Sequence, residues 1–290
     1  MTKSLKQVSI CEAVEVKLLV ENTARGAGIL GEHGLSWLIE SGGRRILFDL
    51  GQGLTLASNA ERMGADWASA EAVVFSHGHY DHVGGWGRWA ERLAGAAVYA
   101  HPGALELKYQ RKADQKMVSA GDPQFAASLR GFEGSLQLSK DPVEVLPGIW
   151  TTGEVPRETD FEDTGGDFYS GSGGHRPDAI PDDLSLFFKT GAGLVIILGC
   201  AHAGVINILR HCQVLTGERV HAVVGGMHLL HASESRMEQT VAALKQISPD
   251  WLAPNHCTGD AAVATLYGAL PGRVFEFHAG QECRFPLKNP

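Results

Sequence analysis

The segment FSHGHYDHVGG, residues 75–85, places three histidines and an aspartate within six residues. These are His77, His79, Asp81 and His82. Imidazole and carboxylate groups are the usual protein ligands of zinc, iron and manganese. A solvated polar loop is the alternative interpretation. Because the segment follows an apolar stretch with the character of a buried strand, where loops are held rigidly, the spacing predicts one wall of a metal site.

The spacing also suggests how the ligands divide. Two histidines one residue apart, His77 and His79, can reach one metal ion from the same side of an extended turn. Asp81 and His82 follow a short turn later and could serve a second ion. Two metal ions ~3.5–4 Å apart can hold a bridging hydroxide, which is a nucleophile at neutral pH. The expected cofactor is one or two divalent metal ions, with zinc first and iron or manganese as alternatives.

Other metal-binding residue types follow apolar stretches in the second half of the chain. His202 lies in LVIILGCAH and His256 in DWLAPNH. Each is either a ligand that completes the site or a core histidine with satisfied hydrogen bonds. Cys200, two residues before His202, is either a thiolate ligand or a buried, inert thiol.

Elements that must position these residues are visible as hydrophobic patterns. Short apolar, β-branched stretches predict strands over 14–20, 71–76, 96–102, 220–226 and 250–256, and hairpins over 35–50 and 184–199. Helical spacing predicts helices over 53–64, 86–95, 203–217, 234–247 and 261–270. Both halves run hairpin, helix, strand, helix, strand. This order predicts the α/β class, in a four-layer αββα sandwich of two mixed sheets flanked by helices.

Two segments do not fit this pattern. Residues 103–135 are polar without a clear period, which predicts a lid or insertion. Residues 153–183 form a long stretch rich in Gly, Asp, Pro and Ser, and loops of this length are usually functional or disordered. We expect residues 1–290 to form a single domain that includes both segments.

Composition limits the partners. The chain has 290 residues and a formal net charge of −8, which disfavours nucleic acid because phosphate backbones call for a basic face. An anionic small-molecule substrate is still compatible, since bound metal ions dominate the local charge. The five cysteines are scattered, and neither a signal peptide nor a membrane-spanning stretch is apparent. We expect a cytoplasmic protein without membrane contact, and a homo-oligomer is left open.

The motifs resemble a known family. HGHYDH matches the HxHxDH signature of the metallo-β-lactamase-fold hydrolases. The stretches EHGLSWLIE, ILFDLGQG, TGEVPRETDFE, LGCAHAGVINIL, GGMHLL and PNHCTG are similar to one branch of that superfamily. The branch is named for 7,8-dihydropterin-6-methyl-4-(β-D-ribofuranosyl)-aminobenzene-5′-phosphate synthase, a methanopterin-pathway activity. The resemblance implies the metallo-β-lactamase αββα sandwich.

The resemblance also implies roles for individual residues. His77, His79 and His202 correspond to first-metal ligands, and Asp81 and His82 correspond to second-metal ligands. His256 corresponds to the final ligand histidine of the superfamily. Asp81 is also the expected catalytic residue, orienting the nucleophilic water. Many relatives carry an aspartate that bridges the metals where this chain has Cys200.

Further candidates surround these ligands. Arg157 in TGEVPR is expected to clamp a substrate phosphate or carboxylate, with a surface ion pair as the alternative. His33, His228 and Asp183 are further candidates for substrate contact. Asp49 is expected to hydrogen-bond a ligand histidine from behind.

The implied function is a metal-dependent hydrolase or transferase. It would use a metal-bound hydroxide, or metal-assisted departure of a leaving group, on a phosphorylated small molecule related to a pterin. A general phosphodiesterase, thioesterase or lactonase of the same fold is one alternative. A non-catalytic metal-binding or ligand-binding protein is another.

Overall fold

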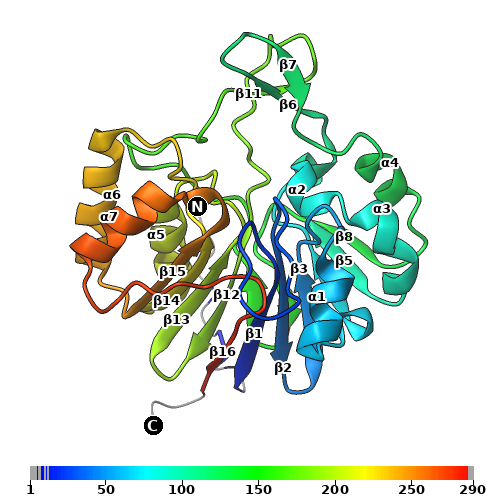
Figure 1. The fold of residues 1–290 in the computed structure, drawn as a ribbon, viewed down its shortest axis with the longest axis horizontal. Helices are drawn as coiled ribbons and strands as arrows, with labels where there is room; N and C mark the ends of the chain where they lie inside the picture. The colour runs from blue at the N-terminus through cyan, green and yellow to red at the C-terminus, as the bar shows by residue number, and fades with distance from the viewer. Residues whose placement is uncertain (1–4, 6–7, 10, 12, 287–290) are drawn as a thin grey trace.

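Two β-sheets pack face to face at the centre of the molecule, and helices cover both outer faces (Figure 1). The computed structural model describes residues 13–286 together with Leu5, Val8, Ser9 and Cys11. The layers follow the order helix, sheet, sheet, helix, which confirms the four-layer αββα prediction.

One sheet has seven strands and the other has six. The seven-stranded sheet has the spatial order β16 (Glu282–Phe285), β1 (Val14–Val20), β2 (Ser36–Ser41), β3 (Arg44–Phe48), β4 (Ala72–Val74), β5 (Ala97–Ala100) and β8 (Leu136–Leu138). The six-stranded sheet has the order β15 (Trp251–Asn255), β14 (Val220–Gly226), β13 (Gly193–Leu198), β12 (Ser185–Thr190), β10 (Ile149–Thr151) and β9 (Glu144–Leu146). Parallel and antiparallel pairs occur in both, so both sheets are mixed as predicted.

Helices lie on both outer faces. On the seven-stranded sheet they are α1 (Leu56–Met63), α2 (Tyr80–Val83), α3 (Trp86–Trp89) and α4 (Phe125–Arg130), with short 3₁₀ turns at Trp67–Ser69, Ala90–Leu93 and Pro102–Leu105. On the six-stranded sheet they are α5 (Val205–Thr216), α6 (Glu234–Ile247) and α7 (Asp260–Ala269), with a 3₁₀ turn at His256–Thr258.

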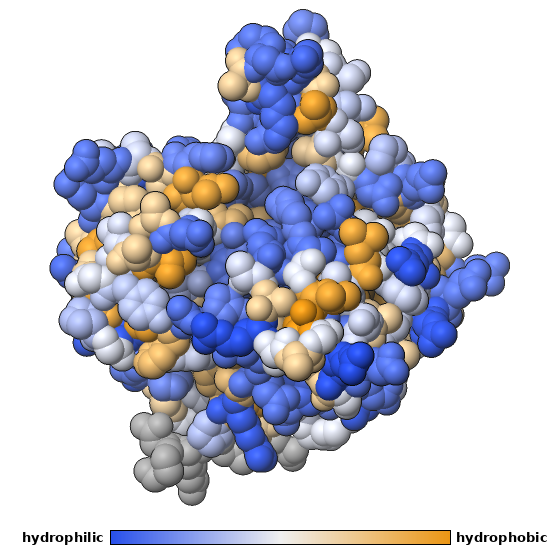
Figure 2. All heavy atoms as spheres, viewed as in Figure 1, coloured by the Kyte–Doolittle hydropathy of each residue, from blue (hydrophilic) through white to orange (hydrophobic). Residues whose placement is uncertain are grey.

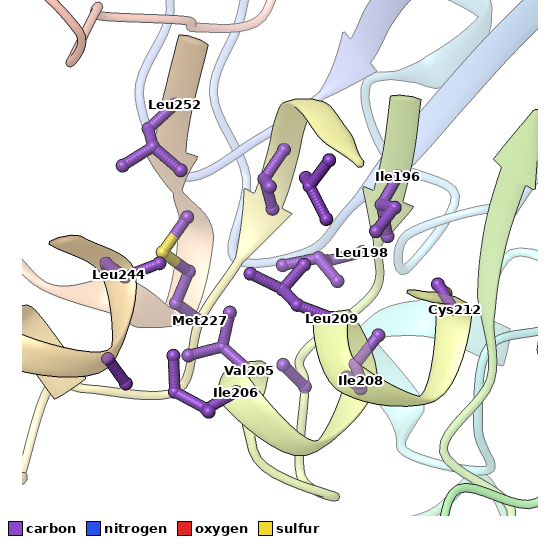
Figure 3. Close-up of a cluster of buried hydrophobic side chains, with 14 of the residues drawn as sticks. Ile196, Leu198, Val205, Ile206, Ile208, Leu209, Cys212, Met227, Leu244 and Leu252 are labelled. Atoms are coloured by element: carbon purple, nitrogen blue, oxygen red, sulfur yellow. The ribbon is translucent and has the colours of Figure 1, made fainter. Parts of the chain in front are cut away.

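The strands are apolar on both faces because each central sheet has protein on both sides. In β13 the side chains of Val195 and Ile197 enter the core between the sheets, whereas Leu194, Ile196 and Leu198 face α5 and α6. Figure 3 shows this outer core, in which side chains of β13 meet those of α5 around Met227. Because side chains alternate along each strand, β13 contributes to two cores, one between the sheets and one beneath the helices.

A third, three-stranded sheet projects from the body above the strand ends (Figure 1). It has the order β11 (Phe168–Ser170), β6 (Lys108–Arg111) and β7 (Met117–Ser119). It therefore joins the two segments that sequence patterning left unassigned, 103–135 and 153–183. Its strands have only three or four residues each, too few to show the alternation that marks a half-buried strand.

Within the described residues, no helix has the length and apolar character needed to cross a bilayer.

Candidate metal centre

The predicted ligands meet at the ends of the central strands. His77 follows β4, the Cys200–His202 turn follows β13, and His256 follows β15. All the predicted ligand residues are at most 8% exposed. Strands of both sheets therefore deliver polar side chains to one buried place between the two halves.

Three histidines form the first group. The ligand nitrogens of His77, His79 and His202 lie within 4.8 Å of one another. The Nε2 atom of His77 is 2.9 Å from Nδ1 of His79. This geometry is compact enough for one ion to contact all three imidazoles.

A carboxylate and two histidines form the second group. Ligand atoms of Asp81, His82 and His256 also lie within 4.8 Å of one another. The Nε2 atoms of His82 and His256 are 3.2 Å apart, and Oδ2 of Asp81 is 3.5 Å from Nε2 of His256. His77 and His79 thus share one group and Asp81 and His82 another, and His77 also forms a potential ligand group with His82 and Cys200.

Cys200 lies between the groups. Its Sγ is 3.1 Å from Nε2 of His82, and it shares a potential ligand group with His77 and His82. The preceding residue is glycine because a Cβ there would lie 2.5 Å from Oγ of Ser76. The thiol thus occupies the place between the two candidate metal positions, where the resemblance implies a bridging carboxylate in relatives.

A second thiol, Cys257, was not among the sequence candidates. It forms a potential ligand group with Cys200 and His256, and its S–H donates to the carbonyl of Cys200 at 3.4 Å. Its position directly after His256 was the available signal. Nothing in the sequence, however, indicates that it meets Cys200.

Asp49 orders the histidines of the first half. Its Oδ2 accepts a hydrogen bond from Nδ1 of His82 at 2.6 Å and one from the Ser76 hydroxyl at 2.7 Å. Because that hydroxyl has given its only proton to Asp49, its oxygen accepts from Nδ1 of His77 at 2.8 Å. Both rings therefore carry a proton on Nδ1 and turn Nε2 inward toward the other candidate ligands, which is how hydrogen-bond partners orient metal-binding histidines. Asp49 thus lies where it was predicted to lie.

Segments distant in sequence order the histidines of the second half. Nδ1 of His202 donates to the carbonyl of Thr164 at 2.7 Å, and Nδ1 of His256 donates to Oδ1 of Asn22 at 3.1 Å. The backbone N–H of His256 donates to Glu21 at 2.8 Å. Asn22, Glu21 and Thr164 were missed because only the folded chain brings them to these rings.

Several of these backbones adopt a left-handed conformation that residues other than glycine rarely occupy. The φ angles are 62° at Asp49, 59° at Ala201, 46° at His228 and 51° at His256. Such strain persists where the surrounding structure determines it, and it concentrates at functional sites.

The electrostatic setting favours neutral imidazoles at the first group. Burial lowers the pKa of His79 to about 3 and holds the pKa of His77 and His202 well below the usual histidine range. At His82 burial also disfavours the charged ring, but Asp49 and Asp81 outweigh it and raise the pKa to about 9. The carboxylates beside the second group thus favour positive charge there.

The side chains fit a metal ion. Because His202 donates from Nδ1, its Nε2 is a bare lone pair, and this atom is buried without any hydrogen-bond partner, as is Nε2 of His79. Such an atom is costly in a protein interior unless a donor or a cation meets it. The mixed set of imidazole, carboxylate and thiol donors suits zinc, with iron and manganese as further fits.

A cavity of about 570 Å³ opens onto this centre. Figure 2 shows it as a hydrophilic hollow beneath the projecting hairpin. Two predicted substrate-contact residues, His33 and His228, line it together with Asp81 and Cys200. Phe168 of β11 lies against His79 with ring centroids 4.8 Å apart, a contact that sequence analysis missed.

Two other predicted substrate-contact residues, Arg157 and Asp183, are not among the residues that line this cavity. Arg157 donates to the backbone carbonyls of His202, at 2.6 Å, and of Ala179, so its guanidinium is engaged away from the cavity lining. Asp183 is 1% exposed and accepts from the backbone N–H of Ala203 at 2.8 Å. Both support the turn that carries His202, and their contact with substrate stays a prediction.

Comparison with known proteins gives a consistent picture. A family model described as the Metallo-beta-lactamase superfamily matches residues 30–254. The 7,8-dihydropterin-6-methyl-4-(beta-D-ribofuranosyl)-aminobenzene-5′-phosphate synthase of Methanocaldococcus jannaschii is 28% identical over 293 residues, covering 97% of this chain and 100% of the relative. An uncharacterized protein of the same organism is 34% identical over 259 residues, covering 87% and 93%. The crystal structure of Tm1679, a metal-dependent hydrolase of the beta-lactamase superfamily, superposes with a TM-score of 0.81 at 30% identity, covering 94% and 99%.

Proposed function

The chain belongs to the metallo-beta-lactamase superfamily, and we propose that it is a metal-dependent hydrolase or transferase acting on a phosphorylated small molecule. The observation that carries the proposal is the buried, unpartnered Nε2 lone pair of His202 facing His77 and His79. A purely structural histidine at this depth would have a hydrogen-bond partner for both ring nitrogens.

Divalent ions would be held by the two ligand groups. His77, His79 and His202 form one, and Asp81, His82 and His256 form the other, with Cys200 between them. When bound, such ions supply Lewis-acid activation of water and of a leaving group. We propose zinc, because sulfur and imidazole are the donors that zinc favours.

Asp81 is the residue that we propose to handle the proton. Its Oδ2 lies 3.5 Å from Nε2 of His256 and 3.6 Å from Nε2 of His33. His33 stands at the cavity mouth with 54% of its side chain exposed. Asp81 would orient the attacking water and accept its proton, and His33 would pass that proton to solvent.

The proposed substrate is related to a pterin. Support comes from the relative named as a dihydropterin-linked synthase, whose whole length this chain covers at 28% identity. The cavity of about 570 Å³ falls in the range of small-molecule sites, and Phe168 adds an aromatic face to its wall. We also propose a cytoplasmic location, in keeping with five cysteines that all carry free thiols.

The test is turnover of bis-p-nitrophenyl phosphate by protein loaded with Zn²⁺ or Mn²⁺. We expect metal-dependent hydrolysis that is lost in His202→Ala and kept in His175→Ala, an exposed histidine outside the cavity lining. Stoichiometric metal without turnover of this diester, of thioesters or of lactones would instead favour a non-catalytic binding protein. A titration with 7,8-dihydropterin on the same preparation tests the pterin relation separately.

A further inference from the structure

The cavity has a roof, formed by the β6–β7 hairpin. Gln110 of β6 pairs with Val118 of β7, and both line the cavity together with Lys112. Alternate residues turn the other way, and Arg111 stacks over the ring of Tyr169 at 4.4 Å. On β6 the two-residue period therefore turns Gln110 toward the cavity and Arg111 toward β11.

The hairpin is fixed to the metal-binding loop. At its base Lys108 is 3% exposed, and its ammonium lies 3.1 Å from Asp178 and 2.5 Å from Asp182. The other carboxylate oxygen of Asp182 accepts from the backbone N–H of Gly78 at 2.9 Å. Because Gly78 separates His77 from His79, this ion pair couples the hairpin directly to the proposed ligands.

A second link joins the same two segments. The backbone N–H of Tyr80 donates to the carbonyl of Ala120 at 2.9 Å, just beyond β7. The roof is thus held at a set position over the metal centre, as a specificity element must be.

The roof of the cavity carries a positively charged side chain, that of Lys112. Among the described residues that line the cavity, Lys112 is the only lysine or arginine. Its ammonium donates one hydrogen bond to Oε1 of Gln110, on the same face of the hairpin. An ammonium has three donors, so Gln110 orients the group and leaves two N–H bonds for a ligand.

We propose that Lys112, oriented by Gln110, is a specificity-determining residue that binds a phosphate group of the substrate at the roof of the cavity. The inference rests on the proposed function and deepens it. The phosphate group bound by Lys112 would be separate from the bond that is broken at the metal centre. A lysine serves this purpose as a point charge, and a charged hydrogen bond of this kind sets affinity without entering the reaction.

The test uses isothermal titration calorimetry of zinc-loaded protein with D-ribose 5-phosphate. We expect Lys112→Gln to weaken binding by about tenfold, the loss of one charge-assisted hydrogen bond. Lys116→Gln is the matched control, because Lys116 lies on the same turn, is exposed and pairs with Asp114 at 2.8 Å outside the cavity lining. Its affinity should equal that of the wild type, and D-ribose should bind at least tenfold more weakly than its phosphate.

Equal affinity of Lys112→Gln and wild type for D-ribose 5-phosphate would overturn the inference, because the phosphate would then bind at the metal centre or elsewhere. So would an equal loss in Lys116→Gln, which would indicate general surface charge. Diester hydrolysis by the same preparations separates this result from the proposed function. Turnover with no effect of Lys112→Gln on binding rejects only the role of Lys112, whereas weakened binding without any turnover rejects only the hydrolytic proposal.

Discussion

The two walls of the candidate metal centre are built in different ways. The wall from the first half is contiguous, running from His77 to His82, and its rings are ordered by Asp49 and Ser76 from the same half. The wall from the second half combines two turns, at His202 and His256. Their rings are ordered by Thr164 and by Asn22, and the latter lies 234 positions from His256. The first wall is therefore local in sequence, and the second exists only in the folded molecule.

This difference predicts different sensitivities. Changes around His77–His82 should act mainly on metal binding, because their supports belong to the same sheet. Changes around His202 and His256 should also depend on the segments that hold these turns, namely the end of β1 and the long loop 153–183. The variants below test that contrast, from the largest expected effect to the smallest.

Loss of a proposed ligand on either wall should be the most damaging change. His77→Ala and His202→Ala each remove one nitrogen from the same three-histidine group. Substitution of a residue that hydrogen-bonds a metal ligand typically lowers metal affinity or activity by about 10–100-fold. Loss of a ligand itself should therefore lower diester turnover by more than about a hundredfold. Elemental analysis should show less bound metal in both variants. Full metal content in His202→Ala, together with reduced metal content in His77→Ala, would show that the second wall does not bind metal.

The buried ion pair beneath the hairpin should give the next largest effect. Lys108→Met leaves Asp178 and Asp182 without their cation, and removal of one partner of a buried pair typically costs ~3–5 kcal/mol. Denaturant unfolding should report this loss in the free energy of unfolding, and Lys116→Met should show almost none.

The same pair has a defined pH dependence. Burial disfavours the charged lysine, but Asp182 and Asp178 outweigh burial and raise the pKa of Lys108 above 10.5. The folded-state pKa lies above the unfolded one. The stabilisation is therefore complete below pH 10.5 and is lost only as pH rises through the folded-state value. A loss of this stabilisation already at neutral pH would contradict the ion pair.

Substitutions of the residues that orient the histidine rings allow the two walls to be compared directly. Asn22→Ala removes the acceptor for His256, and Asp49→Asn weakens the acceptor for His82 and, through Ser76, for His77. Each should lower zinc affinity by about 10–100-fold, with Asp49→Asn the larger because it affects two rings. Competition with a chromogenic chelator measures this affinity. A negligible effect of Asn22→Ala would show that the second wall needs no support from β1.

The smallest effect is expected where loop 153–183 meets α5. Glu162 accepts from the backbone N–H groups of Ile206, at 2.9 Å, and Asn207, at 3.0 Å, in the first turn of that helix. Glu162→Ala should lower the free energy of unfolding by about 0.5–2 kcal/mol, as for loss of a helix cap. Glu158→Ala, exposed in the same loop, is the control and should be neutral. If Glu162→Ala left the free energy of unfolding unchanged, the contact of loop 153–183 with α5 would not help to support the turn that carries His202.

The contrast between the walls also explains what the sequence revealed. His77–His82 could be interpreted at once because four ligand-type residues share one short segment after a strand. The sheets and most helices could be predicted because apolar patterns mark them, and β1, β14 and α6 have the predicted bounds. By contrast, β16 lies at the other end of the chain from its partner β1, and its pairing has no local signal.

Tertiary contacts account for what sequence analysis missed. Cys257 is a candidate ligand only because the fold brings it to Cys200, which lies 57 positions away in the sequence. Phe168 reaches His79 through the third sheet, whose strands of three or four residues are too short to show a pattern. Arg157 was expected at the substrate because a guanidinium suits phosphate. In the fold its guanidinium donates to backbone carbonyls of the His202 turn and of Ala179, and its contact with substrate stays a prediction.

The central claim is that both walls bind metal at one place. Anomalous diffraction from a zinc-loaded crystal, collected on both sides of the zinc absorption edge, tests it most directly. We predict one peak among His77, His79 and His202, and a second beside Asp81, His82 and His256 near Cys200. Absence of any peak at this centre, or a peak that contacts only the His77–His82 segment, would contradict it.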